Sequence, residues 1–100
     1  MFQIRQTKIF LDWIKGLRDE NARARINIRI RRMSLGNPGD IKSVGEGVSE
    51  MRVDYGPGYR IYFTRQGASL VLLLCGGNKN TQSKDIAFAK KLTKDSGNDH

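Results

Sequence analysis

Apolar and polar residues alternate along two stretches in the second half of the chain, "VSEMRVDY" and "YRIYFT". Alternation with a period of two is typical of β-strands that bury one face. The turn residues Gly56, Pro57 and Gly58 stand between the two stretches and predict a hairpin. We expect the face opposite the apolar one to point to solvent. That face carries Glu50, Arg52, Asp54, Arg60, Tyr62 and Thr64.

Two further stretches complete the predicted sheet. The stretch "SLVLLLC" is apolar at every position after its serine, which predicts an interior strand that is covered on both faces. Phe2 and Ile4 alternate with polar neighbours and predict a short N-terminal strand. We therefore expect a twisted antiparallel sheet of about four strands.

A helix is predicted directly after the first strand. Thr7 can cap it, and the apolar residues that follow have the spacing of a buried helical stripe. These residues are Phe10, Trp13, Ile14 and Leu17.

The stretch "RDENARARINIRIRRMSLG" is compatible with either a strand or a helix. Ile26, Ile28 and Ile30 alternate with polar residues as in a strand, but Ala22, Ile26 and Met33 fall on one helical face with Ile30. We interpret this stretch as a second helix that runs antiparallel to the first, so that the two form a helical hairpin.

A last helix is predicted after Gly76 and Gly77, which end the interior strand. Thr81 or Ser83 can cap this helix, and Asp85 suits its first turn because an acidic side chain is favourable there. Its apolar arc consists of Ile86, Phe88, Ala89 and Leu92.

These elements and the composition predict a single α+β domain over residues 1–100. Residues 94–100 are polar and are expected to form a flexible tail. The start of the chain lacks the apolar core of a signal peptide, and the longest apolar run is far shorter than the roughly 20 residues of a membrane helix. We expect a soluble, cytoplasmic protein without a membrane partner.

The charge of the chain narrows the choice of partners. Lys and Arg number 18 against 10 Asp and Glu, which gives a net charge of +8. Such an excess favours an anionic partner, and the outward face of the second helix can either stay solvated or contact phosphate or an acidic protein. That face carries Arg23, Arg25, Arg29, Arg31 and Arg32.

The residues indicate neither a metal nor a cofactor site. His100 is the only histidine and Cys75 the only cysteine, which disfavours a zinc site and a Cys–His nucleophile. Glu50 and Asp54 are separated by arginine rather than clustered as a magnesium site requires. The glycine spacing after the interior strand matches no phosphate-binding loop.

A cationic cluster is the remaining candidate for chemistry. Arg52 and Arg60 share one face of two neighbouring strands, where opposed side chains lie about 5 Å apart. Lys79 follows the strand that is expected to pair next. Two guanidinium groups and an ammonium group can grip a phosphate and stabilise the charge that develops when the 2′-hydroxyl of RNA attacks it. Binding of an anion or a protein without catalysis accounts for the cluster as well.

Proton transfer is the weak part of the nuclease interpretation. RNA cleavage needs a base for the 2′ proton and an acid for the leaving 5′ oxygen. Arginine stays protonated and is a poor base. Lys79 would serve as a base only if it were desolvated, and Tyr62 or Tyr55 would be costly acids. The residues alone therefore leave catalysis, binding and a purely structural surface open.

The segments "MRVDYGPGYRIYF" and "LVLLLCGGNKNTQSKDIAFAKKL" resemble the RelE superfamily of toxins from toxin–antitoxin modules. They are most similar to its HigB-like group of phage-derived addiction-module killer proteins. The resemblance covers almost the whole chain and implies a RelE-like fold. It also implies a metal-independent endoribonuclease, an mRNA interferase that blocks translation by cutting mRNA on the ribosome. The implied partner is a cognate antitoxin, usually a small helix-turn-helix protein.

The resemblance also implies roles for individual residues. Arg60 takes the place of the phosphate-stabilising arginine, while Lys79 and Arg52 match basic residues of the family's site. The tyrosine that RelE carries in its last segment is missing here, and Asp85 or Tyr62 are the candidates to replace it. Residues expected to dock ribosomal RNA are Arg25, Arg29, Arg32 and Lys84.

The superfamily leaves an alternative function. ParE-type toxins have the same fold but inhibit DNA gyrase by binding alone, so the fold does not decide between the two activities. The alternatives to a nuclease are therefore a gyrase-inhibiting toxin and an inactive remnant that binds RNA or protein.

Overall fold

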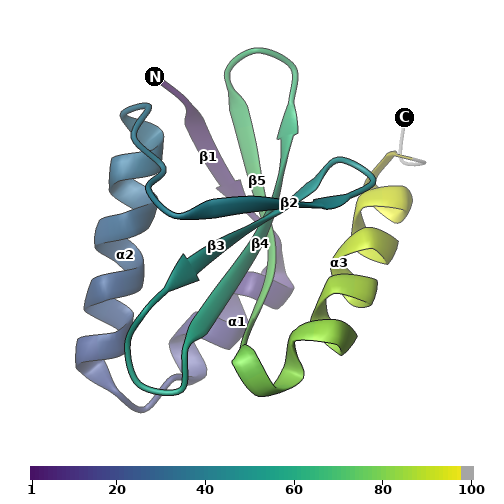
Figure 1. Ribbon diagram of the computed structural model, residues 1–100. Helices are drawn as coiled ribbons and strands as arrows, with labels where there is room; N and C mark the ends of the chain where they lie inside the picture. The colour runs from purple at the N-terminus through teal and green to yellow at the C-terminus, as the bar shows by residue number, and fades with distance from the viewer. Residues whose placement is uncertain (98–100) are drawn as a thin grey trace.

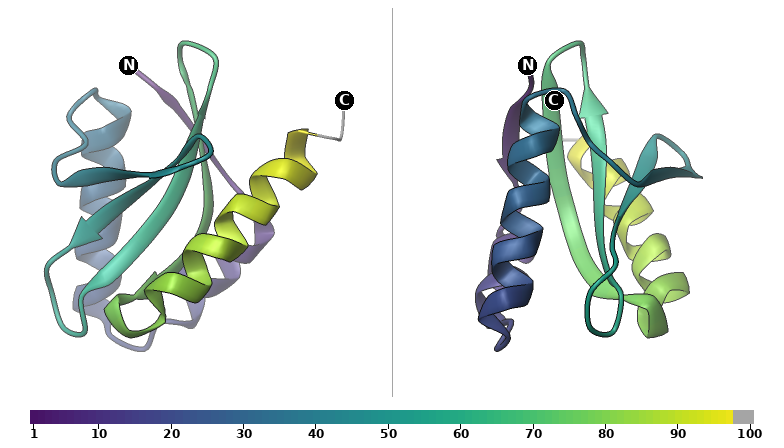
Figure 2. Two further views of the ribbon diagram at one scale, coloured as in Figure 1. Left: turned by 45° about the vertical axis from the view of Figure 1, so that its right-hand side comes forward. Right: turned by 60° about the vertical axis from the view of Figure 1, so that its left-hand side comes forward.

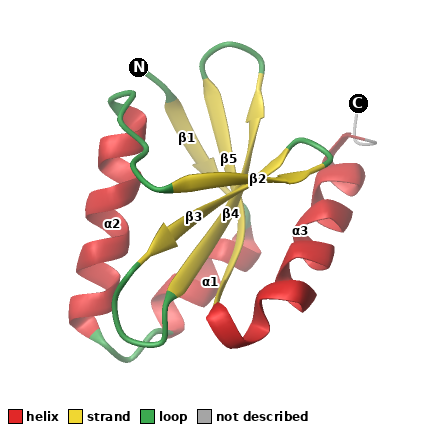
Figure 3. Ribbon diagram, viewed as in Figure 1, coloured by secondary structure: helices red, strands yellow, loops and turns green. Residues whose placement is uncertain are grey.

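The computed structural model describes residues 1–97, and they form an α+β fold of five strands and three α-helices (Figure 1). Figure 3 distinguishes helices, strands and loops. The elements are β1 (Gln3–Gln6), α1 (Lys8–Gly16), α2 (Glu20–Ser34), β2 (Ile41–Gly45), β3 (Val48–Val53), β4 (Tyr59–Gln66), β5 (Leu70–Asn78), the 3₁₀ turn η1 (Lys79–Thr81) and α3 (Gln82–Gly97).

The sheet lies between two layers of helices. Its strand order is β1-β5-β4-β3-β2, with β1 parallel to β5 and every other pair antiparallel. The views in Figure 2 show α1 and α2 on one face of the sheet and α3 on the other. The predicted α+β class is confirmed, and β5 is an interior strand as predicted. The sheet has one strand more than we expected, because β2 was missed, and its first pair is parallel.

The start of α1 is fixed by Thr7, as its sequence predicts. The Thr7 hydroxyl accepts a hydrogen bond from the N–H of Phe10 at 3.0 Å and donates one to the carbonyl of Leu74 at 2.6 Å. A helix cap normally satisfies only the helix's own free N–H groups. Here the same side chain also ties the beginning of α1 to β5.

The ambiguous stretch forms α2, in agreement with the helical interpretation. Asp19 caps it by accepting hydrogen bonds from the N–H groups of Asn21 and Ala22. Ala22, Ile26 and Met33 are buried on one side of this helix. The alternation of isoleucine with polar residues in this stretch therefore does not mark a strand. It occurs in a helix whose outer face carries arginines.

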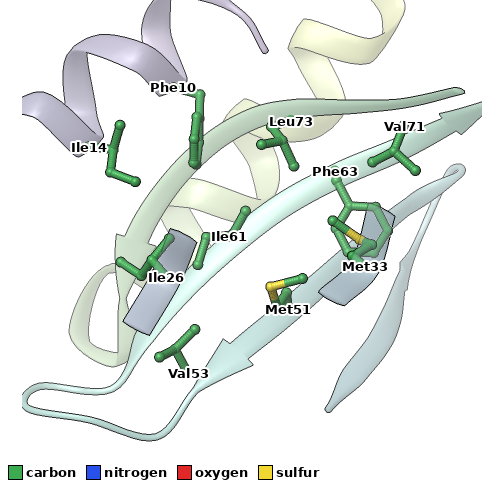
Figure 4. Close-up of a cluster of buried hydrophobic side chains, with 10 residues drawn as sticks. All are labelled: Phe10, Ile14, Ile26, Met33, Met51, Val53, Ile61, Phe63, Val71 and Leu73. Atoms are coloured by element: carbon green, nitrogen blue, oxygen red, sulfur yellow. The ribbon is translucent and has the colours of Figure 1, made fainter. Parts of the chain in front are cut away.

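The core between the sheet and helices α1 and α2 is apolar, and Figure 4 shows it in close-up. Side chains of β3, β4 and β5 with even spacing meet the buried stripes of the two helices, as period-two strands and amphipathic helices require. The core residues are Phe10, Ile14, Ile26, Met33, Met51, Val53, Ile61, Phe63, Val71 and Leu73.

A second, smaller core lies between the sheet and α3. Val48, Tyr62, Leu74 and Cys75 are buried in it against Ala89 of α3. This finding corrects the expectation that the polar face of the hairpin points to solvent. Because α3 covers that face, the polar residues Glu50, Tyr62 and Thr64 are buried.

The last helix differs from its prediction in its cap and its apolar arc. Asn78 caps η1, which leads directly into α3, so neither Thr81 nor Ser83 is needed to start it. Phe88 is 39% exposed and does not belong to the buried arc. The predicted tail, residues 94–100, overlaps the end of α3, and His100 lies outside the described residues. Within residues 1–97, no helix combines the length and the apolar character that crossing a bilayer requires.

Candidate functional site

Arg52 and Arg60 are direct partners in the pairing of β3 with β4, at the end of the hairpin that carries the Gly-Pro-Gly turn. Their side chains differ in exposure, at 36% for Arg52 and only 12% for Arg60. Arg60 is thus mostly covered, whereas the alternation pattern predicted a solvent-facing side chain. One of its Nη groups donates a hydrogen bond to the carbonyl of Tyr59 at 3.2 Å.

Lys79 is held against the turn of the same hairpin. Its N–H donates a hydrogen bond to the carbonyl of Gly58 at 2.8 Å. A Cβ at Gly58 would lie 3.4 Å from Cβ of Lys79 and 3.6 Å from Nη1 of Arg60. Gly58 has a φ of +81°, a conformation that favours glycine. The turn therefore brings Arg60 and Lys79 to one place, and we call Arg52, Arg60 and Lys79 together the basic cluster.

A buried carboxylate lies beneath the basic cluster. Glu50 is 1% exposed, and its Oε1 lies 3.5 Å from Nε of Arg52 and 3.8 Å from Nε of Arg60. Its Oε2 accepts hydrogen bonds from the hydroxyl of Tyr62 at 3.1 Å and from Nε2 of Gln82 at 2.7 Å. The arginines on the hairpin are thus connected to α3 through one carboxylate.

The two glycines at the end of β5 allow both helix layers to approach the same strand. A Cβ at Gly76 would collide with the indole ring of Trp13 on α1, and a Cβ at Gly77 would collide with the carboxylate of Asp85 on α3. Gly77 is also the partner of Arg60 in the pairing of β4 with β5. The Gly-Gly pair therefore places Asp85 near Arg60, and Asp85 in turn accepts a hydrogen bond from the hydroxyl of Thr81.

The predicted proton-transfer residues are placed very differently. Tyr62 is fully buried, and this burial raises the pKa of its hydroxyl well above the ordinary value, with the Glu50 carboxylate adding to the effect. The expectation that Tyr62 faces solvent is wrong, and its hydroxyl is turned toward Glu50 rather than toward a ligand. Lys79 is exposed, so it lacks the burial that a lysine base needs, while Asp85 is half-buried.

A basic groove of about 360 Å³ lies between α2 and the end of β3. Arg25 stacks over the ring of Tyr55 at 4.5 Å, a favourable contact between a cation and an aromatic face. Lys84 lies apart from the groove's lining residues, exposed on the first turn of α3. The groove is lined by Arg25, Ile28, Arg29, Arg32, Val53, Asp54 and Tyr55.

Two of the five arginines on α2 donate side-chain hydrogen bonds to backbone carbonyls. Arg29 donates hydrogen bonds to the carbonyls of Arg52, Pro38 and Asp40, at 2.6, 3.1 and 3.4 Å. Arg23 donates one to the carbonyl of Leu17 in the connection between α1 and α2. The basic face of α2 is therefore not uniform, since Arg25, Arg31 and Arg32 are exposed.

Glu50 and Gln82 are parts of the site that the sequence analysis did not identify as such. Glu50 was expected on the solvent-facing side of the hairpin and was weighed for chemistry only as a metal ligand, and Gln82 was assigned no role. One signal for Glu50 was present, because it shares a face with Arg52 and opposes Tyr62 in the ladder that the hairpin implies. Gln82 gave no signal, since its contact with Glu50 joins elements that are 32 residues apart.

Comparisons with known proteins found similarity in sequence to a protein family and to a bacterial relative. A family model described as "Phage derived protein Gp49-like (DUF891)" matches residues 12–94, a stretch that includes the whole basic cluster. A Haemophilus influenzae protein (strain ATCC 51907 / DSM 11121 / KW20 / Rd), described as an uncharacterized protein, is 50% identical over 95 residues. That alignment covers 95% of this chain and 96% of the relative.

Proposed function

Since the chain belongs to the phage-derived Gp49-like family, which is associated with addiction-module toxins, we propose that it is the toxin of a toxin–antitoxin module. We propose further that it is a RelE-like, HigB-type mRNA interferase that cuts mRNA on the ribosome without a metal or another cofactor. The observation that carries this proposal is the basic cluster at the turn of the β3–β4 hairpin.

The charge of the basic cluster is better explained by a phosphate ligand than by a structural ion pair with Glu50 alone. Two guanidinium groups lie beside one buried carboxylate, Glu50, and Lys79 lies against the turn that precedes Arg60, so positive charge is in excess among these four groups. Arginine can bind two phosphate oxygens at once through its planar donors, and lysine adds a mobile point charge. A scissile phosphate held here would meet donors from two strands and from η1.

The proposed reaction is the attack of a ribose 2′-oxygen on the adjacent phosphorus. The bond from phosphorus to the 5′-oxygen breaks, so the products are a 2′,3′-cyclic phosphate and a 5′-hydroxyl. In this reaction Arg60 and Arg52 stabilise the negative charge on the non-bridging oxygens, and Lys79 assists from the turn. Asp85, beside the strand partner of Arg60, is a better candidate for proton transfer than the buried Tyr62.

Docking to ribosomal RNA is assigned to the basic groove and to Lys84. Exposed guanidinium groups on Arg25 and Arg32 can contact phosphates, which fix position without reading sequence. Arg29 adds charge to the groove, but its donors are shared with three carbonyls. The ribosome would then hold the RNA in place and compensate for the small number of acid–base groups in the site.

The partner proposed for the free toxin is a cognate antitoxin, a small helix-turn-helix protein. The support for this is the family and the resemblance of the chain to HigB-like toxins. A net charge of +8 also favours an anionic surface on any protein that binds this one tightly.

The proposal is tested by adding the protein to a translation extract and mapping mRNA ends. We expect cuts in ribosome-bound mRNA with 5′-hydroxyl ends, while the same RNA free in solution stays largely whole. A matched control is Arg5→Ala, which removes one exposed arginine. Arg5 lies on the edge strand β1, which β5 and β4 separate from β3. This variant should cut as the unaltered protein does.

A gyrase supercoiling assay run in parallel separates the ParE-type alternative. Inhibition of gyrase together with intact ribosome-bound mRNA would show that the nuclease assignment is wrong. Cleavage of free RNA at the same rate would instead remove the ribosome from the proposal.

A further inference from the structure

Glu50 is a carboxylate that is almost completely removed from solvent at 1% exposure. Burying a charge is costly unless other groups compensate for it. Its two oxygens are compensated in different ways. Oε2 accepts hydrogen bonds from Tyr62 at 3.1 Å and Gln82 at 2.7 Å, and Oε1 lies near the Nε atoms of two arginines.

The arginine side of this arrangement is held by charge rather than by hydrogen bonds. Nε of Arg52 and Nε of Arg60 are buried, and neither has a hydrogen-bond partner in the described part of the chain. They lie 3.5 and 3.8 Å from Oε1 of Glu50, within ion-pair range. The carboxylate thus attracts both guanidinium groups at their inner ends. One Nη group of Arg60 donates to the Tyr59 carbonyl, and the other outer Nη groups are left for a ligand.

Stability alone is a poor explanation for this arrangement. Arg52 and Arg60 are direct partners across two strands, and like charges in that position repel each other. A buried ion pair is often no more stabilising than well-packed apolar residues of similar volume. A carboxylate between two arginines does provide one thing that apolar residues do not, which is a fixed direction for both guanidinium groups.

We propose that Glu50 is the positioning residue of the basic cluster. Tyr62 and Gln82 fix the carboxylate, and the carboxylate fixes the inner ends of Arg52 and Arg60 so that their outer Nη groups converge on one phosphate. Since Gln82 is the first residue of α3, the position of that helix is part of the same arrangement. The inference rests on the proposed function, because it assigns Glu50 a role in the same reaction.

The first test is Glu50→Gln, which keeps the side chain's size and removes its charge. In single-turnover cleavage on saturated ribosomes, we expect the rate to fall about 10- to 100-fold, because small displacements of a catalytic group are costly. Ribosome affinity should stay within about twofold, since docking is assigned to other residues. The matched control is Glu46→Gln, the same change at an exposed glutamate that pairs with Lys90 and Lys94, and it should leave the rate unchanged.

A double-mutant cycle shows whether Glu50 acts through Arg60. If it does, Glu50→Gln should cost less in the Arg60→Ala background than in the unaltered protein, and the loss that remains is the part carried by Arg52. Fully additive losses, or a normal rate for Glu50→Gln, would overturn the proposal. If Glu50→Gln does not fold, Gln82→Ala removes one donor from the carboxylate and should lower the rate by less, again with a smaller loss in the Arg60→Ala background than in the unaltered protein.

A second measurement does not depend on cleavage. In ¹⁵N-labelled protein, the Nε–H protons of Arg52 and Arg60 should exchange slowly with water. Glu50→Gln should speed this exchange at least roughly tenfold, because the guanidinium groups can then move and become exposed to solvent. Unchanged exchange would overturn the positioning role. If the protein cuts no mRNA but exchange is slow and depends on Glu50, the proposed function is rejected while the positioning of the arginines by Glu50 is supported.

Discussion

At the scale of single residues, Arg60 carries both the proposed chemistry and part of the fold. Its side chain is 12% exposed and pairs with buried Glu50. If it stabilises the transition state, Arg60→Ala should lower single-turnover cleavage by roughly 10²–10³-fold, the usual loss for one such donor. Arg60→Lys should recover little of this, because an ammonium does not reproduce the planar fork of donors.

The fold limits how this experiment is read. Arg60→Ala leaves Glu50 with Arg52 as its remaining ion-pair partner, so we expect a loss of about 1–3 kcal/mol in the free energy of unfolding. In a small domain each kcal/mol lowers the melting temperature by roughly 4–8 °C. Cleavage should therefore be measured well below both melting temperatures. A near-normal rate in folded Arg60→Ala would reject the catalytic assignment.

Cys75 gives a prediction about pH. Burial raises the pKa of its thiol to about 12, and the nearby Asp85 carboxylate contributes. Between the ordinary value of 9.0 and about 12, the unfolded chain loses a proton that the folded chain keeps, so this group reduces stability as the pH rises through that window. Tyr62 acts in the same direction above its ordinary value of 10.0.

Urea unfolding of the unaltered protein and Cys75→Ala at pH 8 and pH 10 tests this point. Both proteins keep Tyr62, so its effect is common to them. We expect the free energy of unfolding to fall by about 1.4 kcal/mol less in the variant, which is the full value for one proton over one pH unit. An equal fall in both proteins would show that the thiol ionises as easily in the folded state as in the unfolded one.

At the scale of secondary-structure elements, α2 has a divided outer face. Arg25→Ala and Arg32→Ala should weaken ribosome binding, and each should reduce the dependence of log affinity on log salt by about 0.7–0.9 if one phosphate contact is lost. Arg31→Ala, an exposed arginine of the same helix outside the groove, is the matched control. Equal effects of all three would mean that the groove has no special role in docking.

Arg29 should behave differently from its neighbours. Its donors hold the carbonyls of Arg52, Pro38 and Asp40, so Arg29→Ala should lower thermal stability as well as ribosome affinity. This difference follows from the structure alone, because nothing in the sequence distinguishes Arg29 from the other arginines of α2.

The elements that the sequence predicted correctly are those with a buried face of their own. Periodicity identified α1, β3 and β4, an unbroken apolar run identified β5, and the helical interpretation of α2 was confirmed, since each of these elements places apolar residues in a core. β2 was missed because it is an edge strand with mostly exposed residues, so its sequence carries no alternation. Its pairing with β3 is stabilised by backbone hydrogen bonds, which any sequence can supply.

At the scale of the whole molecule, the failed predictions about the polar face of the β3–β4 hairpin share one physical cause. Alternation shows which side chains of a strand lie on the same face, but not what covers that face. The burial of Glu50, Tyr62 and Thr64 is decided by α3, which packs across the sheet from the far end of the chain. The convergence of Arg52 with Arg60 was predictable because one hairpin makes it, whereas the link from Gln82 to Glu50 depends on the complete three-layer arrangement.

The parallel pairing of β1 with β5 determines when the molecule can assemble. Thr7 bonds to Leu74, 67 residues later in the chain, and Lys79 reaches the turn at Gly58 only after β5 is complete. Proteins are synthesised from the N-terminus, and folding of this arrangement must wait for the later partner. A nascent chain therefore has no complete basic cluster until Lys79 has been made. If the protein is the toxin proposed here, the nascent polypeptide is inert until β5 and Lys79 have been made, and the antitoxin is first needed after that point.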